Sequence, residues 1–300
     1  MDKQIDTRRI TIFLAFAFGF AWITGLIIYL TGGLTNSPQI VPGISLALVL
    51  MATTYMWAPA LGNILTRLIT REGWKEVGLR PHFKKGWRYW MAGWFLPAAM
   101  TLIGAALFFV LFPQYFDASL SLVKQQIAAS PTLSSLSPWM VIIIQLVAGV
   151  MIAPILNSIA TFGEEFGWRA YLLPKLMPLG GRKAMLLIGL IWGVWHWPVI
   201  FMGYEYGFKY PGHPWVGPLL FIWVTFGLGI FLGWLTLRSQ SVWPAVIGHA
   251  AINGIAGAAV LVTTGQPNTL LGPLPVGIIG SLGFALVAIA IFVSPNALKE

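Results

Sequence analysis

Eight stretches of mostly apolar residues, each about 20 residues or longer, alternate with polar connections along this chain of 300 residues. A helix needs about 20 such residues to cross a bilayer, because each residue adds about 1.5 Å and the hydrocarbon core is about 30 Å thick. Only 9% of the residues are charged, whereas soluble domains average about 25%, so a soluble enzyme is excluded. We predict an all-α, polytopic membrane protein with about eight transmembrane helices. These helices cover residues 10–31, 43–66, 88–112, 138–162, 184–203, 216–237, 243–263 and 271–293.

The basic residues indicate on which side of the membrane each connection lies. With the N-terminus in the cytoplasm, the cytoplasmic segments carry 16 of the 18 Lys and Arg residues, and the outer connections keep only Lys124 and Lys209. Cytoplasmic connections of membrane proteins carry such an excess, so both chain ends are predicted to be cytoplasmic. The net charge of +9 therefore indicates contact with anionic membrane lipid rather than with nucleic acid.

Few ionisable or strongly polar side chains lie inside the apolar stretches or at their ends. A charge in a spanning helix costs about 2.5–3.5 kcal/mol, so these residues are candidates for a functional site. They are Glu164, Glu165 and Arg169 at the end of the fourth stretch, His196 in the fifth, and His249 with Asn253 in the seventh. Two alternatives remain open: the glutamates could form an interfacial salt-bridge cluster, and the other residues could hydrogen-bond neighbouring helices.

The spacing of these residues separates their roles. Glu164 and Glu165 are adjacent, so they point about 100° apart on a helix. Glu165 and Arg169 stand four residues apart with the acid first, which is the favourable order for an ion pair. This pairing leaves Glu164 as the carboxylate without an assigned partner. His249 and Asn253 have the same spacing and share one helix face.

The residue inventory restricts the chemistry to a few types of hydrolase site. The chain has no cysteine and no H-E-x-x-H sequence, and its spans contain no aspartate. A carboxylate can remove a proton from water, and a second group can donate to the developing oxyanion, so this set can hydrolyse an amide. Glu164, His196 and His249 could instead hold zinc with one position open for water. The metal-free route is favoured, because the two histidines come from different helices.

Three segments resemble the motifs of one known family. Residues 163–169 resemble the E-E-x-x-x-R signature of the CPBP family of CAAX proteases and bacteriocin-processing enzymes. Residues 192–196 resemble its F-x-x-x-H motif, with Trp192 where phenylalanine is usual, and residues 249–253 resemble its H-x-x-x-N/D motif. The resemblance covers about residues 140–260. It divides the chain into an N-terminal three-helix membrane region (1–137), a CPBP core (138–263) and a C-terminal transmembrane helix (264–300).

The resemblance implies an intramembrane endopeptidase with a role for each residue. Glu164 and His196 would activate water, His249 and Asn253 would form the oxyanion hole, and Glu165 with Arg169 would support the site. Trp192 would keep an aromatic ring against His196. The implied substrates are membrane-associated peptides or prenylated, CAAX-like proteins, and no cofactor is required by the motifs, although zinc stays open.

The resemblance also implies a location for the site in the membrane, and two alternative functions stay open. The resemblance places the site in the cytoplasmic half of a membrane, and the motif context is typical of prokaryotes. Along a straight helix, however, His196 would lie about 20 Å from Lys183, which is deeper than the cytoplasmic half of the membrane. One rival is an immunity protein that binds a peptide without cutting it. The other is a proton-coupled transporter, because membrane carboxylates and histidines also relay protons.

Overall fold

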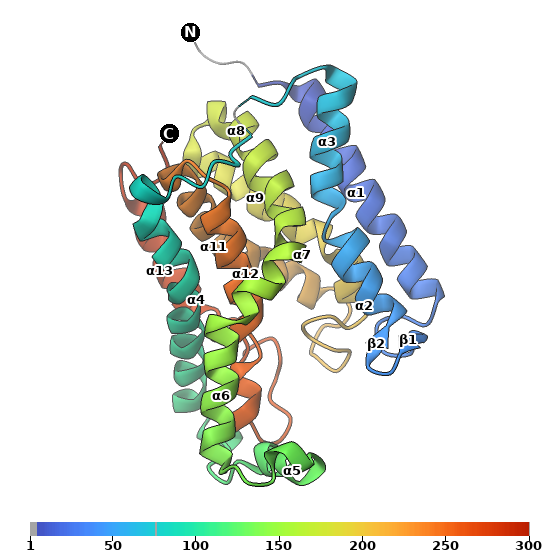
Figure 1. Ribbon diagram of the computed structural model, residues 1–300, viewed down its shortest axis with the longest axis vertical. Helices are drawn as coiled ribbons and strands as arrows, with labels where there is room; N and C mark the ends of the chain where they lie inside the picture. The colour runs from blue at the N-terminus through green and yellow to red at the C-terminus, as the bar shows by residue number, and fades with distance from the viewer. Residues whose placement is uncertain (1–4, 76, 300) are drawn as a thin grey trace.

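Helices make up nearly all of the regular structure in residues 5–75 and 77–299, which the computed structural model describes (Figure 1). The longer helices are α1 (Thr7–Leu30), α3 (Ala58–Thr70), α4 (Phe83–Leu111), α6 (Pro138–Met151), α7 (Ala153–Gly167), α9 (Gly181–Trp195), α11 (Val216–Ser239), α12 (Trp243–Ile255) and α13 (Leu282–Val293). The shorter ones are α2 (Leu46–Leu50), α5 (Ser121–Ala129), α8 (Leu173–Leu176) and α10 (Trp197–Phe201). A small hairpin of β1 (Gln39–Val41) and β2 (Ile44–Ser45) connects α1 to α2. The predicted all-α class is confirmed.

Several helices are long and apolar enough to cross a membrane. Five such segments lie in the described residues: Thr7–Leu30, Leu46–Thr70, Phe83–Leu111, Val216–Ser239 and Trp243–Val262. A sixth forms if Pro138–Met151 and Ala153–Leu179, which meet at an angle of 42°, make one broken span. Large aliphatic side chains on the outer faces of these helices are exposed, as expected for surfaces that contact lipid. The chain is a multi-pass membrane protein.

The expected number of eight spans is not confirmed, because two of the predicted stretches are interrupted. The stretch 184–203 is divided between α9 and α10, with the break at His196 and Pro198 at the start of α10. In the stretch 271–293 only α13 is helical. The residues before it include Gly272, Pro273, Pro275 and Gly277. Proline removes a helical hydrogen bond and glycine disfavours a helix, so an apolar stretch with these residues does not form one continuous helix.

The fourth predicted helix is bent and longer than expected. Pro154 lies in the first turn of α7, just after the bend that separates α7 from α6. Beyond Gly167 the helical path continues through a π-helical turn, Trp168–Leu172, and then through α8. Glu164 therefore lies inside a continuous helical segment, about 18 Å before Leu176 at 1.5 Å per residue, and not at a helix end as the sequence suggested.

Glycines allow the helix that carries the two glutamates to contact the start of α3 and the two residues before it. A Cβ atom added at Gly163 would lie 2.6 Å from the Met56 carbonyl oxygen, and one added at Gly167 would lie 2.3 Å from Pro59 Cβ. On the neighbouring helix, α9, a Cβ atom at Gly193 would lie 2.8 Å from Thr225 Oγ1 of α11. Small residues of this kind permit close helix packing in membranes. They fix the separation of the helices that carry the predicted site.

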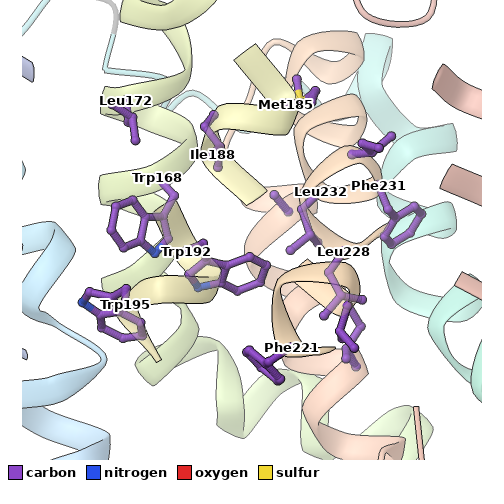
Figure 2. Close-up of a cluster of buried hydrophobic side chains, with 14 of the residues drawn as sticks. Trp168, Leu172, Met185, Ile188, Trp192, Trp195, Phe221, Leu228, Phe231 and Leu232 are labelled. Atoms are coloured by element: carbon purple, nitrogen blue, oxygen red, sulfur yellow. The ribbon is translucent and has the colours of Figure 1, made fainter. Parts of the chain in front are cut away.

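A layer of large buried side chains supports the same helices. Figure 2 shows Trp168 and Trp195 beside Trp192, with Leu228 of α11 facing them. Trp168 is fully buried and Trp195 is 1% exposed. Closely packed interiors transmit small changes in volume to their neighbours. The packing therefore restrains the end of α9, where the second predicted motif lies.

The two ends of the bundle differ in which connections they carry. Figure 1 shows α8 and the end of α3 at one end, and α5 and the β-hairpin toward the other. We call the first the basic end, because the connections 71–82, 177–180 and 240–242, together with the helix ends that they join, carry most of the Lys and Arg residues. The opposite end carries 31–45, 112–137, 202–215 and 263–281. Hydrogen bonds confirm this grouping: Val242 N donates to Gly78 O at the basic end, and the Tyr206 hydroxyl donates to Val276 O at the opposite end.

Candidate active site

The three predicted motifs meet at one cavity of about 100 Å³, which we call the catalytic cavity. Helix α7 contributes Glu164, the end of α9 contributes Trp192 and His196, and α12 contributes His249 and Asn253. These residues are separated by up to 89 positions in the sequence. The structure therefore brings together the four residues for which the sequence suggested chemistry.

Glu164 is a buried carboxylate with one clear hydrogen-bond donor. Its exposed fraction is 2%, and the indole N–H of Trp192 donates to its Oε2 at 2.7 Å. A buried carboxylate needs such partners, because it has lost its hydration. The hydrogen bond uses Oε2 and leaves Oε1 available to a water molecule in the cavity.

Glu165 connects two other residues of the site. Its Oε1 accepts from Arg169 Nη1 at 3.0 Å, which confirms the predicted ion pair, and also from His249 Nδ1 at 2.9 Å. All three side chains are buried. The guanidinium of Arg169 also lies over the ring of Trp192, 4.5 Å from its centroid. The ion pair thus fixes the orientation of His249 as well as that of Glu165.

The hydrogen bonds of the two histidines indicate complementary roles for their second nitrogen atoms. His196 Nδ1 lies 2.8 Å from the Trp192 carbonyl oxygen. A carbonyl only accepts, so Nδ1 carries the proton and Nε2 of the neutral ring is an acceptor. His249 Nδ1 lies 2.9 Å from the Glu165 carboxylate, which only accepts, so this nitrogen carries a proton. Nε2 of a protonated His249 is a donor.

Asn253 completes the inner wall of the catalytic cavity. It lies four residues after His249 on the same face of α12, and its side chain is exposed. Within the described residues its amide makes no hydrogen bond to protein, and it lines both the catalytic cavity and a neighbouring groove. The amide N–H is therefore free to donate to a ligand.

Three residues that the sequence reasoning did not assign also line the catalytic cavity. The Tyr55 hydroxyl donates to the Trp195 carbonyl oxygen at 2.7 Å, which ties the end of α9 to the helix before α3. Tyr204 and Glu205 come from the connection between α10 and α11. Burial raises the pKa of Glu205 to about 7. No spacing rule points to these three, because each belongs to a different segment from the motifs.

The donor atoms of the cavity do not fit a metal ion as they are placed. Among the described residues no three His, Asp or Glu side chains lie close enough together to hold one. We therefore derive no chemical step through zinc at Glu164, His196 and His249.

Comparisons with known proteins agree with the position of the site. Residues 135–255 match the family model described as type II CAAX prenyl endopeptidase Rce1-like. A curated relative, CAAX prenyl protease 2 of Methanococcus maripaludis, is 35% identical over 97 residues, which are 31% of this chain and 35% of the relative. The chain thus matches about a third of that relative's length. The segment that matches the family model contains the five motif residues that line the catalytic cavity: Glu164, Trp192, His196, His249 and Asn253.

Proposed function

Through its residues 135–255 this chain belongs to the CPBP family, and we propose that it is an intramembrane endopeptidase. The observation that carries the proposal is the convergence of Glu164, His196, His249 and Asn253 on one cavity. A carboxylate with an open oxygen, an accepting imidazole and two donors are the groups that amide hydrolysis needs. The printed name of the curated relative supports the same activity.

We assign Glu164 as the general base and His196 as its partner. Oε1 of Glu164 would take one proton from a water molecule, while His196 Nε2 accepts a hydrogen bond from the O–H that the water keeps. The water oxygen then forms a bond to the peptide carbonyl carbon. General base catalysis of this kind contributes about 10²–10⁴-fold.

His249 and Asn253 would stabilise the negative charge on the carbonyl oxygen. Both can donate to it, and one such donor contributes about 10²–10³-fold. When the C–N bond breaks, the proton held by Glu164 passes to the leaving amine. Glu165 and Arg169 act through His249, because their contacts keep its ring oriented.

The substrates we propose are membrane-associated or lipidated polypeptides, of which a prenylated, CAAX-like protein is one class. The catalytic cavity, at about 100 Å³, holds a few water molecules. A peptide must therefore occupy the adjoining groove and widen the cavity. We propose that the basic end lies in the cytoplasm of a prokaryotic cell. His249, about 9 Å along α12 from Trp243, would then lie in the cytoplasmic half of the membrane.

A cleavage assay on membranes tests the proposal. We expect the native protein to cut a member of a set that contains a prenylated CAAX peptide and a peptide library. Glu164→Gln should lower turnover by at least about 10², with peptide affinity nearly unchanged. Glu72→Gln is the matched control, because Glu72 contacts Lys175 and Tyr171 outside the cavity.

Other outcomes of this assay would replace the proposal. Peptide binding without cleavage by the native protein would favour a non-cleaving immunity protein. Proton flux into proteoliposomes, again without cleavage, would favour a transporter. Native rates in Glu164→Gln would remove Glu164 from the mechanism. Loss of activity under thorough chelation, with recovery on adding zinc, would show that the residues rearrange to hold a metal.

A further inference from the structure

The end of α9 leaves one carbonyl oxygen without its usual helical partner. In an unbroken α-helix the Trp195 carbonyl oxygen would accept a hydrogen bond from the N–H of the residue four positions later. Here the N–H of Val199 donates to the His196 carbonyl oxygen instead. An unpaired carbonyl group is costly in a membrane interior, because no water is present to hydrogen-bond it. The break at His196 therefore requires a donor from another segment.

Two side chains from the N-terminal region supply donors to this oxygen. The Tyr55 hydroxyl donates to the Trp195 carbonyl oxygen at 2.7 Å, and the indole N–H of Trp22 in α1 donates to it at 3.3 Å. Tyr55 is fully buried, whereas Trp22 is 42% exposed. The bond from Tyr55 is the shorter one and is shielded from the surroundings of the protein, so Tyr55 is the main partner of this carbonyl group.

Close packing fixes the place of the Tyr55 ring. Tyr55 is the last residue of the π-helical turn Met51–Tyr55, and turns of this kind are frequent at functional sites. A Cβ atom added at Gly25 of α1 would lie 3.6 Å from Tyr55 Cε2 and 3.1 Å from Pro198 Cβ. Helix α1 thus packs against both the tyrosine and the start of α10, and at interior density the hydroxyl has little freedom to leave the carbonyl group.

The carbonyl group that Tyr55 binds belongs to the same planar peptide unit as the N–H of His196. A rotation of this unit would turn the Cα–Cβ bond of His196 and move its ring. The ring also depends on the last turn of α9 through its Nδ1 atom, which lies 2.8 Å from the Trp192 carbonyl oxygen. Tyr55, Trp195 and His196 all line the catalytic cavity. A change at the Tyr55 contact would therefore displace Nε2 of His196 within that cavity.

We propose that Tyr55 is a positioning residue for His196. Its hydroxyl fixes the peptide unit at the end of α9, so that Nε2 of His196 faces the water molecule that Glu164 deprotonates. The inference rests on the proposed function and adds a residue to it. Tyr55 lies outside residues 135–255, the segment that matches the family model, so the N-terminal region contributes to the reaction through this contact.

Tyr55→Phe tests the proposal, because it removes the hydroxyl and keeps the ring. We expect kcat to fall about tenfold with KM nearly unchanged, since peptide binding does not use this hydroxyl. Trp22→Phe removes the longer bond and should lower kcat by less than about threefold. Tyr210→Phe is the matched control and should keep the native kcat. The Tyr210 hydroxyl also donates to a backbone carbonyl, that of Pro214 at 3.0 Å, and Tyr210 does not line the catalytic cavity.

A double-mutant cycle separates positioning from general stability. In a His196→Ala background, Tyr55→Phe should cause no further loss of the residual rate, because the group that Tyr55 positions is absent. An equal loss in both backgrounds would overturn the proposal. A Tyr55→Phe protein with a lower Tm and the native kcat would overturn it as well.

NMR spectra of protein with isotope-labelled histidine keep the test independent of cleavage. The ring nitrogen signals of His196 are assigned by their absence from His196→Ala. Tyr55→Phe should shift these signals, and Tyr210→Phe should not. Unchanged His196 signals in Tyr55→Phe would overturn the positioning role. If the native protein cuts no peptide, the proposed function fails, while these signals still decide whether Tyr55 orients His196.

Discussion

Trp192 donates its indole N–H to the Oε2 atom of Glu164 across the interface between α9 and α7. The same ring lies under the Arg169 guanidinium and against the ring of His249, with centroids 5.3 Å apart in the second pair. Phenylalanine, which is usual at this motif position, has no group that could make the hydrogen bond. Trp192 is therefore a positioning residue that links the base to the groups around it.

Trp192→Phe isolates this hydrogen bond. The substitution keeps an aromatic ring and removes the donor, and a hydrogen bond to a charged group contributes about 1.5–3 kcal/mol. We expect kcat to fall by about 10- to 100-fold while KM changes little. Trp195→Phe is the matched control, because the Trp195 indole donates to Ala17 O and not to the carboxylate. A Trp192→Phe protein that is less stable but keeps the native kcat would show that Trp192 only packs.

Asn253→Ala tests the proposed oxyanion donor. If the amide donates to the carbonyl oxygen in the transition state, kcat should fall by about 10²–10³-fold. Asn296→Ala, at an exposed position near the C-terminus, should leave kcat unchanged. Steady-state kinetics on the same peptide would measure both. A loss of less than about threefold in Asn253→Ala would mean that this amide contributes to helix packing alone.

The buried ion pair should matter more for stability than for chemistry. Arg169→Ala leaves the Glu165 carboxylate buried beside His249 without its cation, and breaking a buried pair in this way costs about 3–5 kcal/mol. We expect a low yield of folded protein and a lower Tm in detergent. The double variant Glu165→Gln, Arg169→Ala should recover part of the Tm, because it removes both charges. A stable but inactive Arg169→Ala protein would instead place Arg169 in contact with the reacting atoms.

Glu205 should make stability depend on pH. Because burial raises its pKa to about 7, the folded protein favours the protonated carboxyl. Its stabilising effect is present at low pH and is lost as the pH rises through about 7. Glu205→Gln should therefore flatten the fall in Tm between about pH 5 and pH 8.

Asp117→Asn is the control for this experiment. The hydroxyls of Ser119 and Ser121 hydrogen-bond the Asp117 carboxylate and hold its pKa well below the usual range. The Asp117 variant should shift Tm by a similar amount at every pH in this window. Equal pH dependence of Tm in the native protein and Glu205→Gln would contradict the assigned role of Glu205.

Local spacing explains which parts of the site could be predicted from the sequence. The pair of Glu165 and Arg169 follows from an interval of four residues on one helix, and the structure contains it. The hydrogen bonds from Trp192 to Glu164 and from His249 to Glu165 join different helices. No periodic pattern encodes such a contact, because it depends on how the helices pack.

The helix count shows a similar limit. Hydropathy identifies stretches that can lie in a membrane, but it does not register where the backbone leaves the helical path. At His196 the helix ends inside an apolar stretch, and the ring lies between Trp195 and Phe221. The interruption that the hydropathy pattern conceals is thus what directs His196 into the cavity. Glu205 was missed for the opposite reason, since it lies outside every apolar stretch.

The contact of Gly163 and Gly167 with the start of α3 and the residues before it has a consequence for how this chain tolerates substitutions. Neither glycine bears a functional group, yet any added methyl group would meet backbone or ring atoms at less than 3 Å. The resulting displacement would separate Glu164 from the indole on α9, so activity would disappear without any change in the reacting groups. In a saturation mutagenesis map, Gly163 and Gly167 should therefore be as intolerant of substitution as Glu164, although neither carries a reacting group.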